Sequence, residues 1–159
     1  ATGFDAITGP LSAIEVIGRD GALLREVWHD GPRSYLGLAT AGFPNLFTIG
    51  GPSSPGVISN VPPTLEHNAE WILQCLLGLR ERGVTQIEAE EQAQEEWIAH
   101  VHELAQSTMY PHAKTSWYNG SNITGESRPF PVFTGGFDTY VDICADVITD
   151  DLRGFRVAN

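Results

Sequence analysis

The spacing of apolar residues predicts a long helix in the middle of the chain. Its apolar stripe recurs at alternating intervals of four and three: Leu65, Ala69, Ile72, Leu76 and Leu79. The prolines at 62–63 suit a first helical turn, and Asn60 is placed to cap it. Gly83 is typical of the residue that ends a helix. We therefore expect a helix from about residue 61 to residue 82.

Two further helices are predicted on the same basis. The run Thr85-Gln86-Ile87-Glu88 reads as a capping box that opens the second. Its buried face is predicted to contain Ala93, Trp97, Val101 and Leu104. The third helix is expected after the glycines at 135–136, with Phe137, Tyr140, Cys144 and Val147 on one face.

The first half of the chain reads as strands and turns. Residues 12–18 alternate in polarity, residues 19–21 suit a turn, and residues 23–28 continue in extended fashion, which together predict a β-hairpin. The apolar run 46–49 is typical of a buried strand in a parallel sheet. A short final strand is expected at 155–157. The predicted class is α/β, with a β-hairpin, one buried strand and about three helices.

Composition and charge narrow the possible functions. The chain has 159 residues, of which 42% are hydrophobic and 18% charged, as in a folded protein. Its net charge of -11 disfavours nucleic acid and anionic membranes as partners. No apolar run is long enough to span a bilayer. Glu88, Glu90 and Glu91 are read, with the glutamates at 95 and 96, as one solvated helix face.

Motifs for several kinds of chemistry are missing from the sequence. The five histidines show no metal-ligand spacing, so we predict no metal site. Cys75 and Cys144 fall on apolar helix faces and are expected to be buried thiols, which fits a cytoplasmic protein. There is no nucleophile elbow, P-loop or dinucleotide fingerprint in this chain.

The segment 46–65 carries the strongest chemical signal. A short apolar run is followed by Gly-Gly-Pro, a loop and a helix. Such a unit brings backbone N–H groups and the positive end of a helix to one place, where α/β proteins bind cofactors. An ordinary connection between a strand and a helix has the same appearance. Trp117 lies in the long irregular segment 109–134, and it too has two interpretations: its ring contacts a ligand, or it anchors the loop in an apolar gap.

Six motifs occur in an order that resembles the C-terminal third of Baeyer–Villiger monooxygenases, among them the phenylacetone, steroid and cyclohexanone types. The motifs are Ala-Thr-Gly-Phe-Asp-Ala at 1–6, Tyr-Leu-Gly at 35–37, Phe-Pro-Asn-Leu-Phe at 43–47, Gly-Pro-Ser-Ser-Pro at 51–55, Ser-Trp-Tyr at 116–118 and Gly-Gly-Phe at 135–137. The resemblance implies the C-terminal part of a Rossmann-like flavoprotein with two dinucleotide-binding domains. Residues 1–9 would end the NADP-binding domain. Residues 10–159 would belong to the FAD-binding domain, with a mobile loop at 110–134.

The resemblance also implies roles for particular residues. The cofactor-binding residues would be Thr2, Gly3, Asp5, Gly51, Pro52, Asn60, Val61, Trp117 and Asn122. The substrate-lining residues would be Pro55, Gly56, Val57, Ile58, Val61 and Trp117. The family's catalytic arginine lies upstream of residue 1, so no catalytic residue is assigned in this chain. Residues 56–60 resemble the phenylacetone and steroid types, whereas residues 61–66 resemble the cyclohexanone type, which leaves the ketone open.

The implied activity depends on FAD and NADPH. One oxygen atom of O2 would be inserted into a ketone to give an ester or a lactone, with the N-terminal part of the same enzyme supplying the remaining site. Two alternatives stay open on the residues alone. One is a non-catalytic fragment or binding module, and the other is a related flavin monooxygenase that oxidises nitrogen or sulfur.

Overall fold

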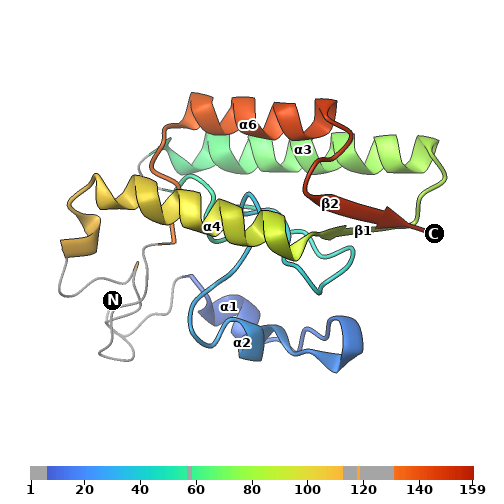
Figure 1. Cartoon of the computed structure of the whole chain (residues 1–159), viewed down its shortest axis with the longest axis horizontal. Helices are drawn as coiled ribbons and strands as arrows, with labels where there is room; N and C mark the ends of the chain where they lie inside the picture. The colour runs from blue at the N-terminus through green and yellow to red at the C-terminus, as the bar shows by residue number, and fades with distance from the viewer. Residues whose placement is uncertain (1–6, 57–58, 113–117, 119–130) are drawn as a thin grey trace.

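The three longest described helices surround a shared core, and the computed structural model describes residues 7–56, 59–112, 118 and 131–159 (Figure 1). The helices are α3 (Val61–Glu81), α4 (Glu91–Gln106) and α6 (Phe137–Thr149). Helices α3 and α6 lie side by side, and α4 lies across from them. The three predicted helices are therefore confirmed. No helix in the described ranges is long and apolar enough to cross a membrane.

A two-stranded antiparallel sheet closes one end of the helical layer. Strand β1 (Gln86–Ala89) pairs with β2 (Phe155–Ala158), so that Ile87 faces Val157 in the register. The final strand is confirmed. The capping box at 85–88 is a wrong prediction, because these residues enter β1 and α4 begins at Glu91. The deciding contacts are long-range: Asn45 exchanges hydrogen bonds with Ile87 through its backbone N–H and its Oδ1, and β2 pairs along the other edge.

The predicted β-hairpin in the first half is also wrong. The segment forms three short helical turns, α1 (Gly9–Ser12), η1 (Arg19–Gly21) and α2 (Leu24–Val27). All that the described residues retain of the hairpin is one antiparallel bridge between Ile17 and Leu23. The backbone N–H of Trp28 donates to the Leu24 carbonyl at 2.9 Å, which closes a helical turn, and both side chains are buried. They pack with Phe43 in a small separate cluster.

The apolar run 46–49 is not a strand of a parallel sheet. Phe47 makes an isolated antiparallel bridge to Ala39, and Thr48 N–H donates to the Leu38 carbonyl at 2.9 Å. The segment thus crosses residues 36–39 once and continues as an irregular loop. Another isolated bridge, which is parallel, joins Pro55 to Phe133.

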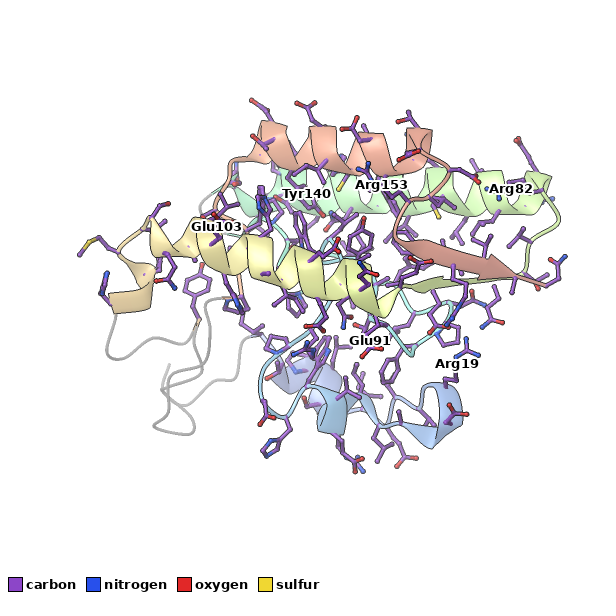
Figure 2. The ribbon with its side chains drawn as sticks, in the orientation of Figure 1. Arg19, Arg82, Glu91, Glu103, Tyr140 and Arg153 are labelled. Carbon is purple, nitrogen blue, oxygen red and sulfur yellow. The ribbon has the colours of Figure 1, made fainter. Side chains whose placement is uncertain are left out.

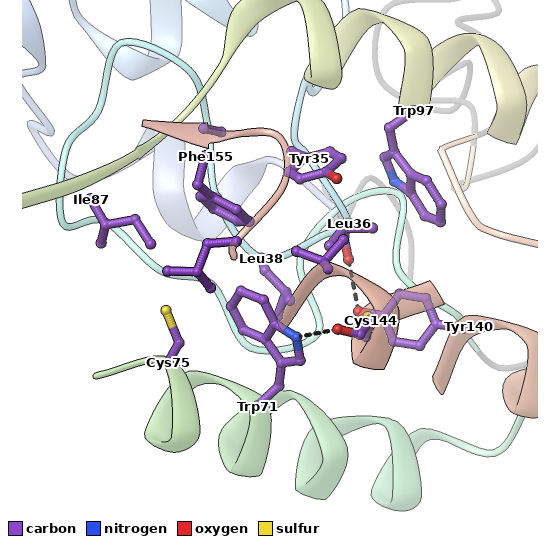
Figure 3. Packing of buried hydrophobic residues seen from close by; sticks show 14 of the residues in the cluster. Tyr35, Leu36, Leu38, Trp71, Cys75, Ile87, Trp97, Tyr140, Cys144 and Phe155 are labelled. Atoms are coloured by element: carbon purple, nitrogen blue, oxygen red, sulfur yellow. Dashed lines mark hydrogen bonds between the residues drawn. The ribbon is translucent and has the colours of Figure 1, made fainter. Parts of the chain in front are cut away.

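The main core lies between the three helices and the sheet (Figure 3). Helix α3 contributes Thr64, Asn68, Trp71, Cys75 and Leu79 as its buried face. This face is rotated from the predicted stripe, of which Leu65, Ala69 and Leu76 are exposed. The faces of α4 and α6 are largely as predicted, with Trp97, Val101, Tyr140, Cys144 and Val147 buried. Cys75 and Cys144 are free buried thiols, as expected.

The rotation leaves an apolar strip on the outer face of α3. Leu73 is 57% exposed, and Leu76 and Leu77 are close to half exposed. These residues fall on one side of the helix because they are spaced by three and four. Exposed leucines in such a row are typical of a surface that is covered in a larger assembly.

Glu88 is buried rather than part of a solvated helix face. Its side chain is 5% exposed and accepts hydrogen bonds from Arg19, from Arg156 and from the backbone N–H of Gly42. Figure 2 shows Arg19 on the N-terminal segment. Burial by itself would raise the pKa of Glu88, but these hydrogen bonds and the two guanidinium charges outweigh it, and the pKa lies below its usual value. This ion network attaches the N-terminal segment to the sheet.

Candidate functional site

A mainly apolar cavity lies between the irregular loop 47–56 and the first turn of α3. Its volume is about 460 Å³. Residues 131–132 and Tyr118 close one side, and the segment around Leu11 closes another. The lining residues are Ile7, Pro10, Leu11, Phe47, Thr48, Ile49, Gly50, Gly51, Pro52, Ser54, Pro55, Gly56, Val61, Thr64, Leu65, Tyr118, Pro131 and Val132. None of these side chains carries a charge.

The loop reaches the cavity by a close crossing of two backbone segments. The hydroxyl of Thr48 donates to the Gly37 carbonyl at 2.8 Å. A Cβ atom on Gly51 would lie 2.3 Å from Thr48 Oγ1 and 2.4 Å from that same carbonyl oxygen. A Cβ on Gly37 would meet Ser54 at 2.5 Å, and Gly37 has a φ of +74°. Glycine is therefore required at both positions for the two segments to cross.

A buried hydroxyl network fixes the other end of the loop. The Ser34 hydroxyl donates to the Pro52 carbonyl and is 2.8 Å from the Ser53 hydroxyl. The indole N–H of Trp97 on α4 donates to Ser53 Oγ at 3.1 Å. Ser53 also donates its backbone N–H to the Pro131 carbonyl at 2.8 Å. These bonds attach the loop to α4 and to residues 131–133, so the cavity wall is held on both sides.

The N-terminus of α3 supplies the positive end of a helix dipole to the cavity. Val61 is the first helical residue and lines the cavity, as does Thr64. Pro62 and Pro63 have no backbone N–H, so the donors of this turn are reduced to those of Val61 and Thr64. The Asn60 side chain does not cap the helix, contrary to the prediction, although Asn60 occupies the N-cap position with a φ of +65°.

The chemistry of this cavity follows from its lining. It offers apolar walls, close backbone approach at Gly51 and Gly56, and a helix N-terminus. A flat, largely apolar group with one electron-rich edge matches those features. The described residues supply no acid, base or cation to the wall, so they are suited to binding and orienting a group rather than to proton transfer.

The structure brings five of the predicted residues together. Gly51, Pro52, Pro55, Gly56 and Val61 all line the cavity, and Asn60 adjoins it. The other predicted residues lie outside the described residues, namely Thr2, Gly3, Asp5, Val57, Ile58, Trp117 and Asn122.

Sequence reasoning missed several lining residues. Leu65 was assigned to the core stripe, and Thr48 and Ile49 were read as part of a strand. Tyr118 follows Trp117 directly but was not given a role. Its ring makes an edge-to-face contact with Tyr110 and packs beside Val132. The proximity of Tyr118 to a predicted ligand residue was the available signal. In the described residues, no group of three or more His, Cys, Asp or Glu side chains converges as a metal site would require.

Comparisons with known proteins decide the family. Cyclopentanone 1,2-monooxygenase from Comamonas sp. (strain NCIMB 9872) is 41% identical over 100% of this chain and 29% of its own length. The crystal structure of cyclohexanone monooxygenase from Rhodococcus sp. Phi1 bound to NADP+ superimposes with a TM-score of 0.93, at 35% identity over 100% of this chain and 29% of that one.

The chain is homologous to the C-terminal region of Baeyer–Villiger monooxygenases. The predicted resemblance is thereby confirmed, and so is the predicted fold class as the C-terminal part of such a flavoprotein, apart from the β-hairpin and the buried strand corrected above. Two other relatives widen the comparison. Phenazine N-monooxygenase PhzNO1 from Lysobacter antibioticus is 39% identical over 98% of this chain and 28% of its own length. A structure of OTEMO in complex with FAD and NADP gives a TM-score of 0.90, at 33% identity over 99% of this chain and 29% of that one. No protein-family model matches the sequence. The chain spans less than a third of the length of these Baeyer–Villiger relatives.

Proposed function

We propose that this chain forms the C-terminal portion of an FAD- and NADPH-dependent Baeyer–Villiger monooxygenase, which inserts one oxygen atom of O2 into a ketone to give an ester or a lactone. The observation that carries the proposal is the uncharged cavity at the N-terminus of α3, in a chain whose full length matches the C-terminal region of such enzymes. Residues 1–9 would end the NADP-binding domain, and residues 10–159 would belong to the FAD-binding domain.

The cavity fits the edge of a flavin. Gly51 lets the backbone approach closely, because any side chain there would strike Thr48 and Gly37. A Cβ on Gly50 would meet Leu65 Cδ2 at 2.6 Å, so glycine is also needed to keep the turn against α3. FAD, when bound, would carry electrons from NADPH to dioxygen, and this chain would form one wall of the flavin site.

The residues of this chain would act by holding and shielding. The N-terminus of α3, through Val61 and Thr64, would stabilise negative charge on the group bound there. The apolar side chains of Leu65 and Val132 would exclude water from the oxygen-transfer step. Pro55 and Gly56, with Val57, Ile58 and Trp117, would shape the ketone pocket. The catalytic cation would come from outside these 159 residues.

Two assays test the proposal on the longer polypeptide that contains this chain. An absorbance scan reads bound flavin, and product analysis after incubation with NADPH, O2 and cyclopentanone or phenylacetone reads oxygen insertion. We expect a flavin spectrum and ketone-dependent ester or lactone. A protein that binds no flavin would overturn the proposal and leave the non-catalytic binding module. A protein that oxidises NADPH without any effect of a ketone would overturn the ketone as its substrate.

A matched pair of variants places the activity in the cavity. Val61→Trp fills the space beside the first turn of α3, whereas Gln74→Trp adds the same ring on an exposed part of that helix. We expect Val61→Trp to raise the KM for the ketone or to abolish flavin binding, and Gln74→Trp to change neither. Equal effects from both variants would argue against this cavity.

One comparison favours a second candidate, oxidation of a ring nitrogen. The similarity to phenazine N-monooxygenase is nearly as high as that to cyclopentanone monooxygenase. Offering phenazine and cyclopentanone to the same preparation distinguishes the two. An N-oxide with no lactone would favour the second candidate.

A further inference from the structure

The side chain of Asn68 is completely buried on α3. It lies on the same face as Thr64 and Trp71, one turn from the residues that line the cavity. Burying a primary amide without partners is costly, so its hydrogen bonds have to be strong and specific.

Those hydrogen bonds form a chain with a single direction. Asn68 Oδ1 accepts from the backbone N–H of Gly50 at 2.9 Å, and Nδ2 donates to the hydroxyl of Tyr140 at 2.8 Å. That hydroxyl donates in turn to the Leu36 carbonyl at 2.7 Å, the bond drawn in Figure 3. Burial, above all, raises the pKa of Tyr140 well above its usual value, so the hydroxyl remains a donor. Figure 2 places Tyr140 in the interior between the helices.

The bond to Gly50 joins the two walls of the cavity. Gly50 precedes Gly51 in the wall formed by the loop, and its φ is +66°. Asn68 belongs to α3, whose first turn is the opposite wall. Among the described residues, no other hydrogen bond joins segment 48–56 to α3. A Cβ on Gly50 would meet Leu65 Cδ2 at 2.6 Å, so the turn already lies close to α3, and the Asn68 bond limits how far the turn can withdraw.

Packing of α3 on α6 does not by itself account for this amide. Trp71, on the same face of α3, donates its indole N–H to the Cys144 carbonyl of α6 at 2.8 Å. That bond already joins the two helices within the core, as Figure 3 shows. Asn68 adds a hydrogen bond to Gly50, and this bond joins α3 to the cavity wall rather than to α6.

We propose that Asn68 is a positioning residue, which sets the separation between the Gly50–Gly51 turn and the first turn of α3. The identity of the group received in that space, the flavin edge, rests on the proposed function. The role of Asn68 in setting the separation of the cavity walls does not depend on which ligand binds there.

Three variants of the longer polypeptide test it. Asn68→Leu keeps the approximate shape and removes both hydrogen bonds. Trp71→Phe is the matched control, because it removes a buried hydrogen bond from the same face of α3 without touching the loop. Asn68→Asp is the conservative rescue, since it keeps an acceptor oxygen for the Gly50 N–H.

The first measurement is amide hydrogen exchange in segment 48–56, which requires no flavin. Loss of one buried hydrogen bond corresponds to roughly tenfold faster exchange at Gly50. We expect that change in Asn68→Leu, and a rate within about twofold of the unmodified protein in Asn68→Asp and Trp71→Phe. Equal exchange in Asn68→Leu and Trp71→Phe would overturn the inference. If Asn68→Leu fails to fold, Asn68→Ala takes its place, because it also removes the acceptor of the Gly50 N–H. Faster exchange at Gly50 in Asn68→Ala than in Trp71→Phe supports the inference, and equal exchange overturns it.

The second measurement compares flavin affinity and the fraction of NADPH consumption that yields oxygenated product. We expect Asn68→Leu to lower flavin affinity or that fraction by about tenfold, since misplaced walls orient the bound group poorly. Trp71→Phe lowers the melting temperature but leaves both values unchanged. An unmodified protein without flavin would refute the proposed function only, because the exchange measurement would still decide on Asn68.

Discussion

Replacing Gly51 with alanine tests whether the close crossing beneath the cavity is required. The new Cβ would lie 2.3 Å from Thr48 Oγ1 and 2.4 Å from the Gly37 carbonyl oxygen. Gly37 cannot retreat, because it is packed against the backbone of Ser54. The same substitution at Gly78 on α3 meets nothing within 4 Å, and this residue is the control.

The magnitude follows from three terms. Overpacking costs about 1–3 kcal/mol. Displacing Thr48 breaks its hydrogen bond to Gly37, which costs about 1 kcal/mol more. Alanine also has less conformational freedom than glycine in the unfolded chain, which stabilises the folded state by roughly 0.4–1 kcal/mol. We expect Gly51→Ala to lower the free energy of unfolding by about 1–3 kcal/mol. In contrast, Gly78→Ala should raise it by about 0.5–1 kcal/mol, because alanine is favoured over glycine within a helix.

Urea unfolding of the longer polypeptide, followed by tryptophan fluorescence and by flavin release, measures both changes. The two variants carry the same chemical change, so a loss of stability at Gly51 only cannot be an effect of the added methyl group by itself. A stability for Gly51→Ala equal to or above that of the unmodified protein would refute the crossing as the structure describes it.

Three further predictions concern other parts of the molecule. Because the pKa of Glu88 is lowered, the ion network stabilises the folded state above pH 4.5, the usual pKa of the group, and this stabilisation is lost as the pH falls further. Glu88→Gln should therefore weaken the dependence of the free energy of unfolding on pH in that range. An unchanged acid transition would contradict this. The isolated 159-residue chain should self-associate through the outer strip of α3, so Leu73→Glu should increase the monomer fraction in sedimentation and Gln74→Glu should not. Burial raises the pKa of Cys75 to about 11 and that of Cys144 to about 12, so a thiol reagent at pH 8 should label neither before unfolding, and rapid labelling of the native protein would count against the burial of both.

The helices were predictable because their signals are local. Pro62, Pro63 and Gly83 mark the ends of α3, and the apolar spacing of α6 places Tyr140, Cys144 and Val147 correctly. Which face of α3 is buried was not predictable from apolar residues alone. The buried face includes Thr64, whose hydroxyl donates to the Asn60 carbonyl of the same turn, and Asn68, whose amide is bonded by Gly50 and Tyr140 on other segments.

Strand β1 could not be assigned from its own residues, although the final strand could. Residues 85–88 satisfy a local rule for a helix start, yet Ile87 pairs with Asn45 and Val157, which are distant in sequence. In the hairpin prediction, alternation over residues 12–18 was a weaker constraint than the helical turn at 24–28, which packs Leu24 and Trp28 against Phe43. Long-range pairing and burial overrode local propensity at each of these places.

For the candidate site, the sequence by itself determined the composition of one wall. The order of its motifs pointed to the family, and the residues that it singled out include Gly51, Pro52, Pro55, Gly56 and Val61, which all line the cavity. Tertiary structure alone decided how that wall is held. The bonds from Asn68 to Gly50 and from Trp97 to Ser53 connect residues 18 and 44 positions apart, and no periodicity in the chain encodes them. A sequence pattern records which residues a segment offers, whereas the distance between two cavity walls depends on contacts that exist only once the chain is folded.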